Sequence, residues 1–196
     1  MRTIIVSDYN PNWPTAFQQL RAQIWPAVQD IALTIEHVGS TSVPGLAAKP
    51  VIDMSIIVAS EQEVALCIER LATLGYEHLG NLGVEGRETF KRSEEPIAHN
   101  LYLCPQGSRG IRNHLAVRDY LRSHPKTSRE YGELKKRLAA EFPNDIDSYI
   151  GGKTDLILSI LQEQGLSEQD LAAIGAANRK EILSKPRSRC GVPEET

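Results

Sequence analysis

The stretch EHVGSTSVPGLAAKPVID, at residues 36–53, decides how this chain folds. Residues 33–38 alternate apolar and polar side chains, as a strand does, and the alternation stops at the pair Gly39-Ser40. A loop of small residues follows, and the β-branched run of residues 51–58 then predicts a central strand. The stretch therefore predicts two strands joined by a loop rich in glycine and serine.

The residue types in this loop describe a site for a metal-bound nucleotide. Gly39 lets the backbone approach a ligand, and Ser40 and Ser42 offer hydroxyl and amide groups to phosphate oxygens. Lys49 supplies a positive charge, and Asp53 is a suitable ligand for a divalent cation. A plain loop followed by a structural aspartate is the alternative, and the residues alone leave both interpretations open.

Outward from this loop, the hydrophobic pattern predicts further strands and then a helical C-terminal half. Asn12 is expected to cap the first helix, with Pro14 just inside it. The expected helices span residues 13–30, 61–74, 111–123, 126–141, 145–164 and 167–183, and the further strands span residues 76–79, 88–92 and 97–103. These elements predict an α/β (α+β) domain over residues 1–165, followed by a helix and a mobile tail over residues 166–196.

The composition is that of an ordinary globular protein. The chain has 196 residues, 41% of them hydrophobic and 24% charged, and a net charge of −3. This charge balance argues against binding to nucleic acid or to an anionic membrane over the whole surface. Three widely spaced cysteines without a CxxC pair, and a start without a secretory or membrane segment, predict a cytoplasmic protein. Homo-oligomerisation is left open.

Residues 37–53 resemble the hallmark of the GrpB-like family, which belongs to the nucleotidyltransferase superfamily. The other matching pieces are residues 9–14 with Phe17, Gly86-Arg87, residues 99–105, residues 113–122, and Tyr149 with Lys153-Thr154. The resemblance covers about residues 5–162. It implies a nucleotidyltransferase-like mixed β-sheet flanked by helices, with Mg²⁺ as cofactor and a nucleoside triphosphate as substrate.

Two departures from the superfamily pattern concern its acidic residues. The superfamily carries two acidic residues one position apart and a third on a later strand, but Ser55 stands two positions after Asp53. Asn100 and Tyr102 occupy the later strand where a third carboxylate is expected. A serine cannot supply the negative charge with which a two-metal site holds both cations.

Three other carboxylates, those of Glu36, Glu85 and Glu88, remain as substitutes, although solvent exposure is the simpler account of Glu85 and Glu88. Glu36 and His37 point to opposite faces of their strand, so only one of the two can face Asp53.

Cationic residues are better supplied than acidic ones. Residues 108–137 contain nine Lys and Arg against three acidic residues, a local charge of +6. His114, Arg118 and Arg122 lie at i, i+4 and i+8 and form one stripe of a helix, which is either a phosphate-facing wall or a solvated face. The resemblance selects His114 and Arg118, and Arg87 and Lys91 are further candidates for an anionic ligand. The P-loop-like string at residues 151–154 is interpreted as a helix position, because no strand precedes it.

Two functions follow as alternatives. The first is an enzyme that uses a magnesium nucleoside triphosphate to transfer a nucleotidyl group to an unknown acceptor. The second is a non-catalytic module that binds a nucleotide or another small phosphorylated ligand, including one related to coenzyme A, since a similar domain is appended to some dephospho-coenzyme A kinases. The site residues expected in either case are Asp53 and Ser40 as catalytic residues, Asp53 as metal ligand, and Gly39, Ser40, Ser42, Lys49, Arg87, Lys91, His114 and Arg118 as ligand contacts.

Overall fold

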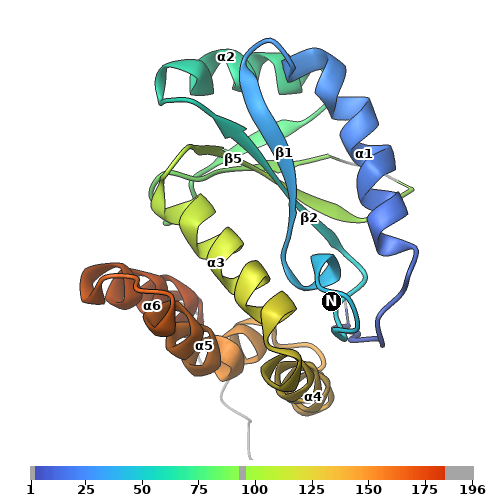
Figure 1. Ribbon diagram of the computed structural model, residues 1–196, viewed down its shortest axis with the longest axis vertical. Helices are drawn as coiled ribbons and strands as arrows, with labels where there is room; N and C mark the ends of the chain where they lie inside the picture. Colours follow the sequence, from blue (N-terminus) through green and yellow to red (C-terminus); the bar gives the residue numbers. More distant parts are fainter. Residues whose placement is uncertain (1–2, 93–95, 184–196) are drawn as a thin grey trace, which may run out of the picture.

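A mixed five-stranded sheet forms the centre of the molecule (Figure 1). The computed structural model describes residues 3–92 and 96–183, so the tail expected over residues 184–196 lies outside the described residues. The strands are β1 (Ala32–Val38), β2 (Ile52–Val58), β3 (Glu77–Gly80), β4 (Glu88–Lys91) and β5 (His99–Pro105), and they lie in the order β1-β2-β5-β4-β3. Strands β2 and β5 pair in parallel and the other neighbours are antiparallel. The mixed sheet inferred from the sequence is confirmed.

Two helices, α1 (Trp13–Val28) and α2 (Gln62–Thr73), cover one face of this sheet. The buried side chains of α1 are those at the three- and four-residue spacing seen in the sequence, and they pack against apolar residues of β1, β2 and β5. Asn12 stands at the expected N-cap position, but its side chain makes no capping hydrogen bond. The Asn10 side chain instead accepts a hydrogen bond from the Asn12 backbone N–H, at 2.9 Å.

The helical C-terminal half lies on the other face of the sheet. It consists of α3 (Arg109–Ser123), α4 (Pro125–Glu141), α5 (Ile146–Glu163) and α6 (Glu168–Leu183). Ile111 of α3 packs on Ile57 and Cys104 of the sheet, and α4, α5 and α6 are grouped beyond α3 (Figure 1). Gly132 of α4 faces Leu46 and Ala47 of the loop between β1 and β2, so α4 packs against this loop. No helix within the described parts of the chain is long and apolar enough to cross a membrane.

The loop between β1 and β2 is held close to β2. It begins at Gly39 and continues as a short 3-10 helix, η1 (Ser40–Ser42). Gly39 has a positive φ of 67°, and a Cβ at this position would collide with the Asp53 carboxylate. Both the backbone conformation and the space therefore require glycine here. Further along the loop, Ala48 pairs with Ser7, which fastens the N-terminal segment to it.

The strand register gathers polar side chains in two rows on the α3 face. Asp53 of β2 lies opposite Asn100 of β5, and Ser55 lies opposite Tyr102. Glu36 of β1 is paired with Ser55 and so joins the second row. Side-chain alternation along β2 had placed Asp53 and Ser55 on one face, and the register extends that arrangement across three strands.

Candidate anion site

Asp53 lies at one end of the sheet, beside the Gly39 turn. The Asn100 side-chain amide donates a hydrogen bond to Asp53 Oδ1, at 2.7 Å. Burial raises the pKa of Asp53, while the bond from Asn100 and the charges of three lysines act in the opposite direction. These lysines are Lys153, Lys49 and Lys135, which come from α5, the loop and α4. The carboxylate is therefore surrounded by more positive than negative charge.

Lys135 is the most unusual of these lysines. Its side chain lies on α4 and the residue is only 2% exposed, yet its Nζ has no hydrogen-bond partner. Nζ is 4.4 Å from the centre of the Tyr131 ring, whose π face attracts the positive charge of a protonated amine. Burial, and then the charges of Lys153 and Lys49, lower the pKa of Lys135 to about 6, although the charge of Asp53 acts in the opposite direction. A buried amine of this kind is stabilised by any anion that enters beside it.

Two tyrosines join the lysines to the turn. The hydroxyls of Tyr131 and Ser40 are hydrogen-bonded to each other, so α4 helps to position η1. Lys49 and Lys153 approach the same Tyr149 ring, with Nζ 5.6 and 5.2 Å from its centre. Burial lowers the pKa of Lys153, as it does that of Lys135. The arrangement can neutralise a multiply charged anion placed between the turn, Asp53 and the lysines.

Four of the residues selected from the sequence meet at this site: Gly39, Ser40, Lys49 and Asp53. His114 and Arg87 instead contact the neighbouring row of side chains, which contains Ser55 and Tyr102. His114 Nδ1 is 3.0 Å from the Ser55 hydroxyl, and the Arg87 guanidinium lies 4.9 Å from the centre of the Tyr102 ring. Burial and then the charge of Arg87 lower the pKa of His114 to about 3, so its imidazole is neutral. Arg87 Nε is buried without a hydrogen-bond partner. Lys91 is exposed on β4 and is not among the cations that act on Asp53.

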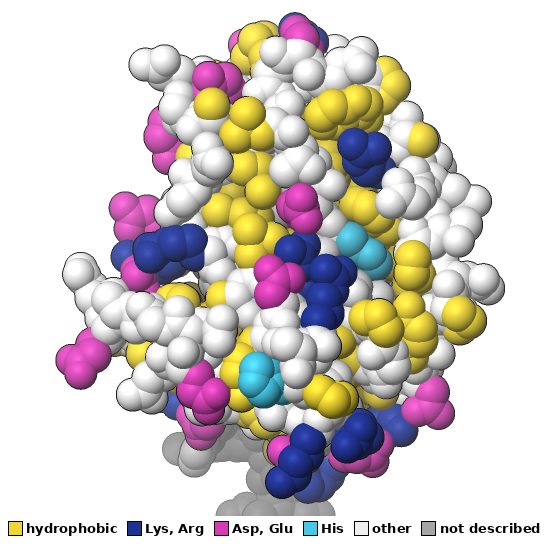
Figure 2. Space-filling model, in the orientation of Figure 1, with side chains coloured by type: hydrophobic (Ala, Val, Ile, Leu, Met, Phe, Trp, Pro, Cys, Tyr) yellow, Lys and Arg dark blue, Asp and Glu magenta, His cyan; other side chains and the backbone are white. Residues whose placement is uncertain are grey.

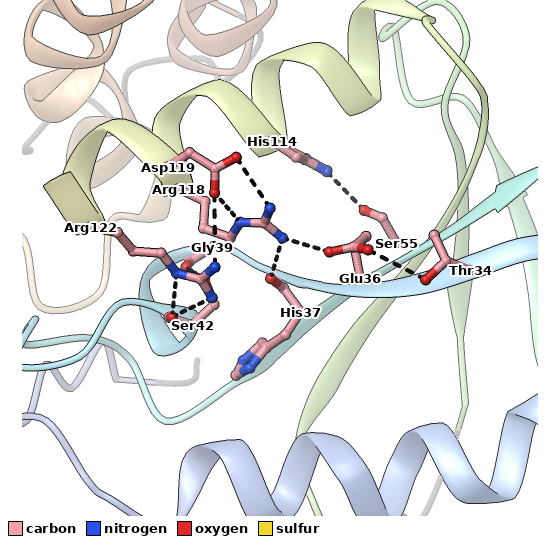
Figure 3. Close-up of polar contacts among 10 residues, drawn as sticks. All are labelled: Thr34, Glu36, His37, Gly39, Ser42, Ser55, His114, Arg118, Asp119 and Arg122. Carbon is pink, nitrogen blue, oxygen red and sulfur yellow. Dashed lines mark hydrogen bonds and ion pairs between the residues drawn. The ribbon is translucent and has the colours of Figure 1, made fainter.

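Arg118, Arg122 and Ser42 lie together at the free edge of β1 (Figure 3). Arg118 donates to Glu36 at 2.8 Å, to Asp119 at 2.7 Å and to the His37 carbonyl at 3.2 Å. Arg122 donates to the Ser42 carbonyl at 2.9 and 3.2 Å. The expected helix stripe therefore does face the sheet, but Arg118 and Arg122 hold β1 and the turn in place.

The carboxylates that were candidates for a second metal ligand are engaged elsewhere. Glu36 is paired with Ser55 and therefore faces the same side of the sheet as Asp53, but it is bound by Arg118, as Figure 3 shows. Glu85 pairs with Arg109 at 3.5 Å, and Glu88 pairs with His78 at 2.6 Å. Within residues 3–92 and 96–183, no three His, Cys, Asp or Glu side chains are grouped so that they could hold a metal ion. The donor set at Asp53 therefore does not fit a two-metal centre.

Lys135 and Lys153 were not selected from the sequence. Lys135 was counted only as part of a basic segment, although it follows Tyr131 by four residues on a helix whose buried face also carries Leu138. A lysine on an apolar helix face is the signal that could have identified it. Lys153 was correctly placed on a helix, and its reach toward Asp53 depends on how α5 packs against α4. Gly152 sets that packing, since a Cβ there would collide with Leu138.

Comparisons with known proteins identify the family and several relatives of the chain. Residues 3–163 match the family described as GrpB protein. The chain is 32% identical over 165 residues to the glutamate-rich protein GrpB of Alkalihalophilus pseudofirmus, across 82% of this chain and 95% of that protein. It is 38% identical over 156 residues to the UPF0157 protein YqkA of Bacillus subtilis, across 80% of this chain but only 46% of YqkA. The chain thus spans about half the length of YqkA.

A more distant relative carries a specific name. The chain is 27% identical over 169 residues to a dephospho-CoA kinase of Mycolicibacterium paratuberculosis, across 74% of this chain and 42% of that protein.

Solved structures agree on the fold. A crystal structure of GrpB from Enterococcus faecalis superposes with a TM-score of 0.72 at 36% identity, over 86% of this chain and 98% of that chain. The GLD-2/RNP-8 complex superposes with a TM-score of 0.51 at 14% identity, over 96% of this chain and 74% of that chain, a likeness in fold alone. The expected nucleotidyltransferase-like fold, with its mixed sheet and helical C-terminal half, is confirmed. The domain boundary expected at residue 165 stays a prediction.

Proposed function

Since the chain belongs to the GrpB family, which has a nucleotidyltransferase-like fold, we propose that it binds the phosphate groups of a small phosphorylated ligand beside Asp53. The observation that carries this proposal is the buried, unpartnered amine of Lys135 within a group of three lysines. A phosphate group would give this amine a charged partner and would compensate for its burial.

The balance of charge favours an anion over a cation at this position. Lys49 and Lys153 outnumber the single carboxylate of Asp53, and Lys135 adds a third charge when it is protonated, so a bare divalent cation would be repelled on entry. A di- or triphosphate would instead match the excess charge, and lysines act as point charges toward phosphate.

Nucleotides and compounds related to coenzyme A are the first ligands to test. Both carry a phosphate chain that suits a cluster of lysines, and one relative of the chain is named a dephospho-CoA kinase. The proposal therefore extends to dephospho-coenzyme A as a ligand of this chain.

Magnesium-dependent nucleotidyl transfer is the second candidate function, and Asp53 is the observation that favours it. A single Mg²⁺ needs only one or two protein carboxylates when substrate phosphates supply further oxygens. In that case Asp53 would hold the ion, Ser40 would contact the phosphates, and the metal would help to stabilise charge on the reacting phosphate. Because Ser55 and Asn100 replace the other acidic positions, a mechanism with two metal ions is not proposed.

Calorimetric titration with ADP, ATP and dephospho-coenzyme A, each with and without Mg²⁺, tests the binding proposal. The wild-type chain should bind at least one of them without Mg²⁺. The Asp53→Asn variant should then bind more tightly, because it loses a negative charge beside the phosphate. The matched control is Asp30→Asn, which removes the carboxylate of an exposed pair with Arg70, 3.0 Å apart, at the far end of α1. Absence of binding by all three ligands in every condition would refute the proposal.

The same variant separates the two functions. If the chain is a nucleotidyltransferase, Asp53→Asn should weaken Mg-ATP binding and abolish transfer from a labelled nucleoside triphosphate. If the chain only binds the ligand, wild type and variant should both lack turnover, and the gain in affinity should persist with Mg²⁺.

A further inference from the structure

A pocket lies between α1 and α3, along the free edge of β1. Its volume is about 570 Å³, within the range of small-molecule sites. The residues that line it are Tyr9, Pro14, Phe17, Gln18, Ile35, Glu36, His37, Ser42, Pro44, Arg118 and Arg122. Figure 2 shows this face, where basic side chains and a histidine lie beside hydrophobic ones. The described lining does not include Asp53, Lys135 or Lys153, so the pocket is separate from the anion site.

One side of the pocket is apolar and flat. The Phe17 ring stacks on the His37 ring with centres 4.7 Å apart and planes 8° from parallel. Figure 3 shows the His37 ring pointing away from α3, toward α1. Burial, and then the charges of Arg122 and Arg118, lower the pKa of His37 to about 4, so this ring is neutral at physiological pH. Tyr9 and the two prolines extend this wall, which suits a planar ring.

The other side of the pocket carries two arginines with their acidic partners. Two arginines line it against one glutamate. Arg118 is matched by Glu36 and Asp119, and its side chain is only 11% exposed. Arg122 is 42% exposed and its nearest carboxylate, that of Asp119, is 3.8 Å away, so its hydrogen bonds go to a carbonyl. Arg122 is therefore the cation with capacity for a further acceptor.

The edge of β1 adds polar groups of the backbone. The His37 carbonyl points away from β2, since it accepts from Arg118. In an antiparallel pair, alternate residues direct both backbone groups outward, so Ile35 and His37 direct theirs toward the pocket that they line. Backbone N–H donors and a guanidinium thus converge beside an apolar wall.

We propose that this pocket binds a small aromatic carboxylate, with its ring against the Tyr9 and Phe17 wall and its carboxylate at Arg122. The site is independent of the proposed phosphate site, and it shares with it only the loop that begins at Gly39. The apolar wall accounts for the ring, and the half-exposed guanidinium of Arg122 accounts for the anionic group.

Titration with indole-3-acetate, followed by calorimetry and by amide NMR shifts, tests this proposal. The matched ligand is tryptamine, which has the same ring with a positive charge. We expect saturable binding of indole-3-acetate, with shifts at Ile35 and His37, and at least 10-fold weaker binding of tryptamine. Arg122→Gln should weaken indole-3-acetate binding about 10-fold, as for the loss of one charge-assisted hydrogen bond.

Two tryptophan variants keep the test independent of Arg122, which also supports the loop. Gln18→Trp should fill the pocket and abolish binding, whereas Gln19→Trp, on an exposed neighbour that does not line the pocket, should leave it intact. Asp53→Asn should have no effect, which separates this site from the phosphate site. Absence of saturable binding in the millimolar range, equal binding of tryptamine, or full binding by Gln18→Trp would each overturn the proposal.

Discussion

The lysines around Asp53 and the arginines at the edge of β1 are two cationic regions with opposite states of pairing. Arg118 has three acceptors and Arg122 bonds to a loop carbonyl. Lys135, on the adjacent helix, has a buried amine without any hydrogen-bond partner. Both regions draw on the same basic segment of the sequence. The difference shows that local charge counts do not separate cations that hold the fold from cations left available for a ligand.

The chemistry of the two side chains explains this division. The planar guanidinium of Arg118 can satisfy a carboxylate and a carbonyl at once, so it can close the edge of a sheet. Lysine carries a compact charge that is expensive to bury, and its pKa falls when no partner is present. A buried lysine without a partner lowers the stability of the folded chain. Binding of an anionic ligand would compensate for this cost and would explain why a lysine is present.

Replacement of Lys135 by methionine should have the largest effect. We expect phosphate-ligand affinity to fall by about 100-fold, since a charge-assisted hydrogen bond contributes roughly 1.5–3 kcal/mol. The free energy of unfolding should increase by at least about 2 kcal/mol, because each pKa unit corresponds to about 1.4 kcal/mol and the buried amine is removed. Calorimetry and urea denaturation measure the two effects.

The control for Lys135 is its neighbour on α4. Lys136 pairs with Asp8 at 2.7 Å and with Glu133 at 3.2 Å on the surface. Lys136→Met should change both stability and affinity little, because surface ion pairs contribute about 0–1 kcal/mol. A loss of stability in Lys135→Met equal to that of an ordinary core substitution would contradict the account of an uncompensated amine.

Replacement of Arg118 by glutamine should have the opposite pattern. The variant leaves Glu36 and the His37 carbonyl without their shared donor, so we expect a loss of about 2 kcal/mol in the free energy of unfolding. Phosphate-ligand affinity should stay within about 2-fold of wild type, since these contacts are structural. Unchanged stability together with a large loss of affinity would show that Arg118 is a ligand contact, as the family resemblance implies.

The fold could be predicted from the sequence because its signals are local. Residues 13–28 show helical spacing and residues 52–58 show a β-branched run, and these elements end within two residues of their expected bounds. The missing side-chain cap of α1 could not be predicted, because Asn12 does stand at the N-cap position and only the geometry of the preceding turn, in which Asn10 accepts from the Asn12 N–H, departs from the expectation.

The site could be predicted only in part, for a physical reason. Gly39, Ser40, Lys49 and Asp53 lie within one loop and its strands, so their proximity is encoded locally. The lysines of α4 and α5 reach Asp53 only through the packing of the two helices, which depends on Gly152, where a side chain would collide with Leu138. Sequence spacing does not reveal such a long-range approach.

Acid should destabilise the arginine region through His37, which lies at the edge of β1. The native pKa of His37, about 4, lies below the ordinary value of 6.5, so the unfolded chain takes up the proton first. Stability is therefore retained above pH 6.5 and is lost as the pH falls toward 4. At pH 5.5 we expect a loss of about 1 kcal/mol from His37 relative to pH 7.5. Urea denaturation should show a smaller loss for His37→Gln, and an identical loss would contradict this assignment.

Proton uptake on anion binding is the smallest expected effect and the most direct contrast between the two regions. Sulfate resembles phosphate but does not titrate near neutral pH. Any proton that is taken up when sulfate binds at pH 8 is therefore bound by the protein and not by the ligand. Lys135, with a pKa of about 6, is mostly neutral at that pH and should gain up to one proton when sulfate binds beside it. Indole-3-acetate at Arg122 should bind without uptake, because a guanidinium stays protonated. Calorimetry in buffers of different ionisation enthalpy measures both values, and sulfate heats that are independent of the buffer would contradict a neutral Lys135.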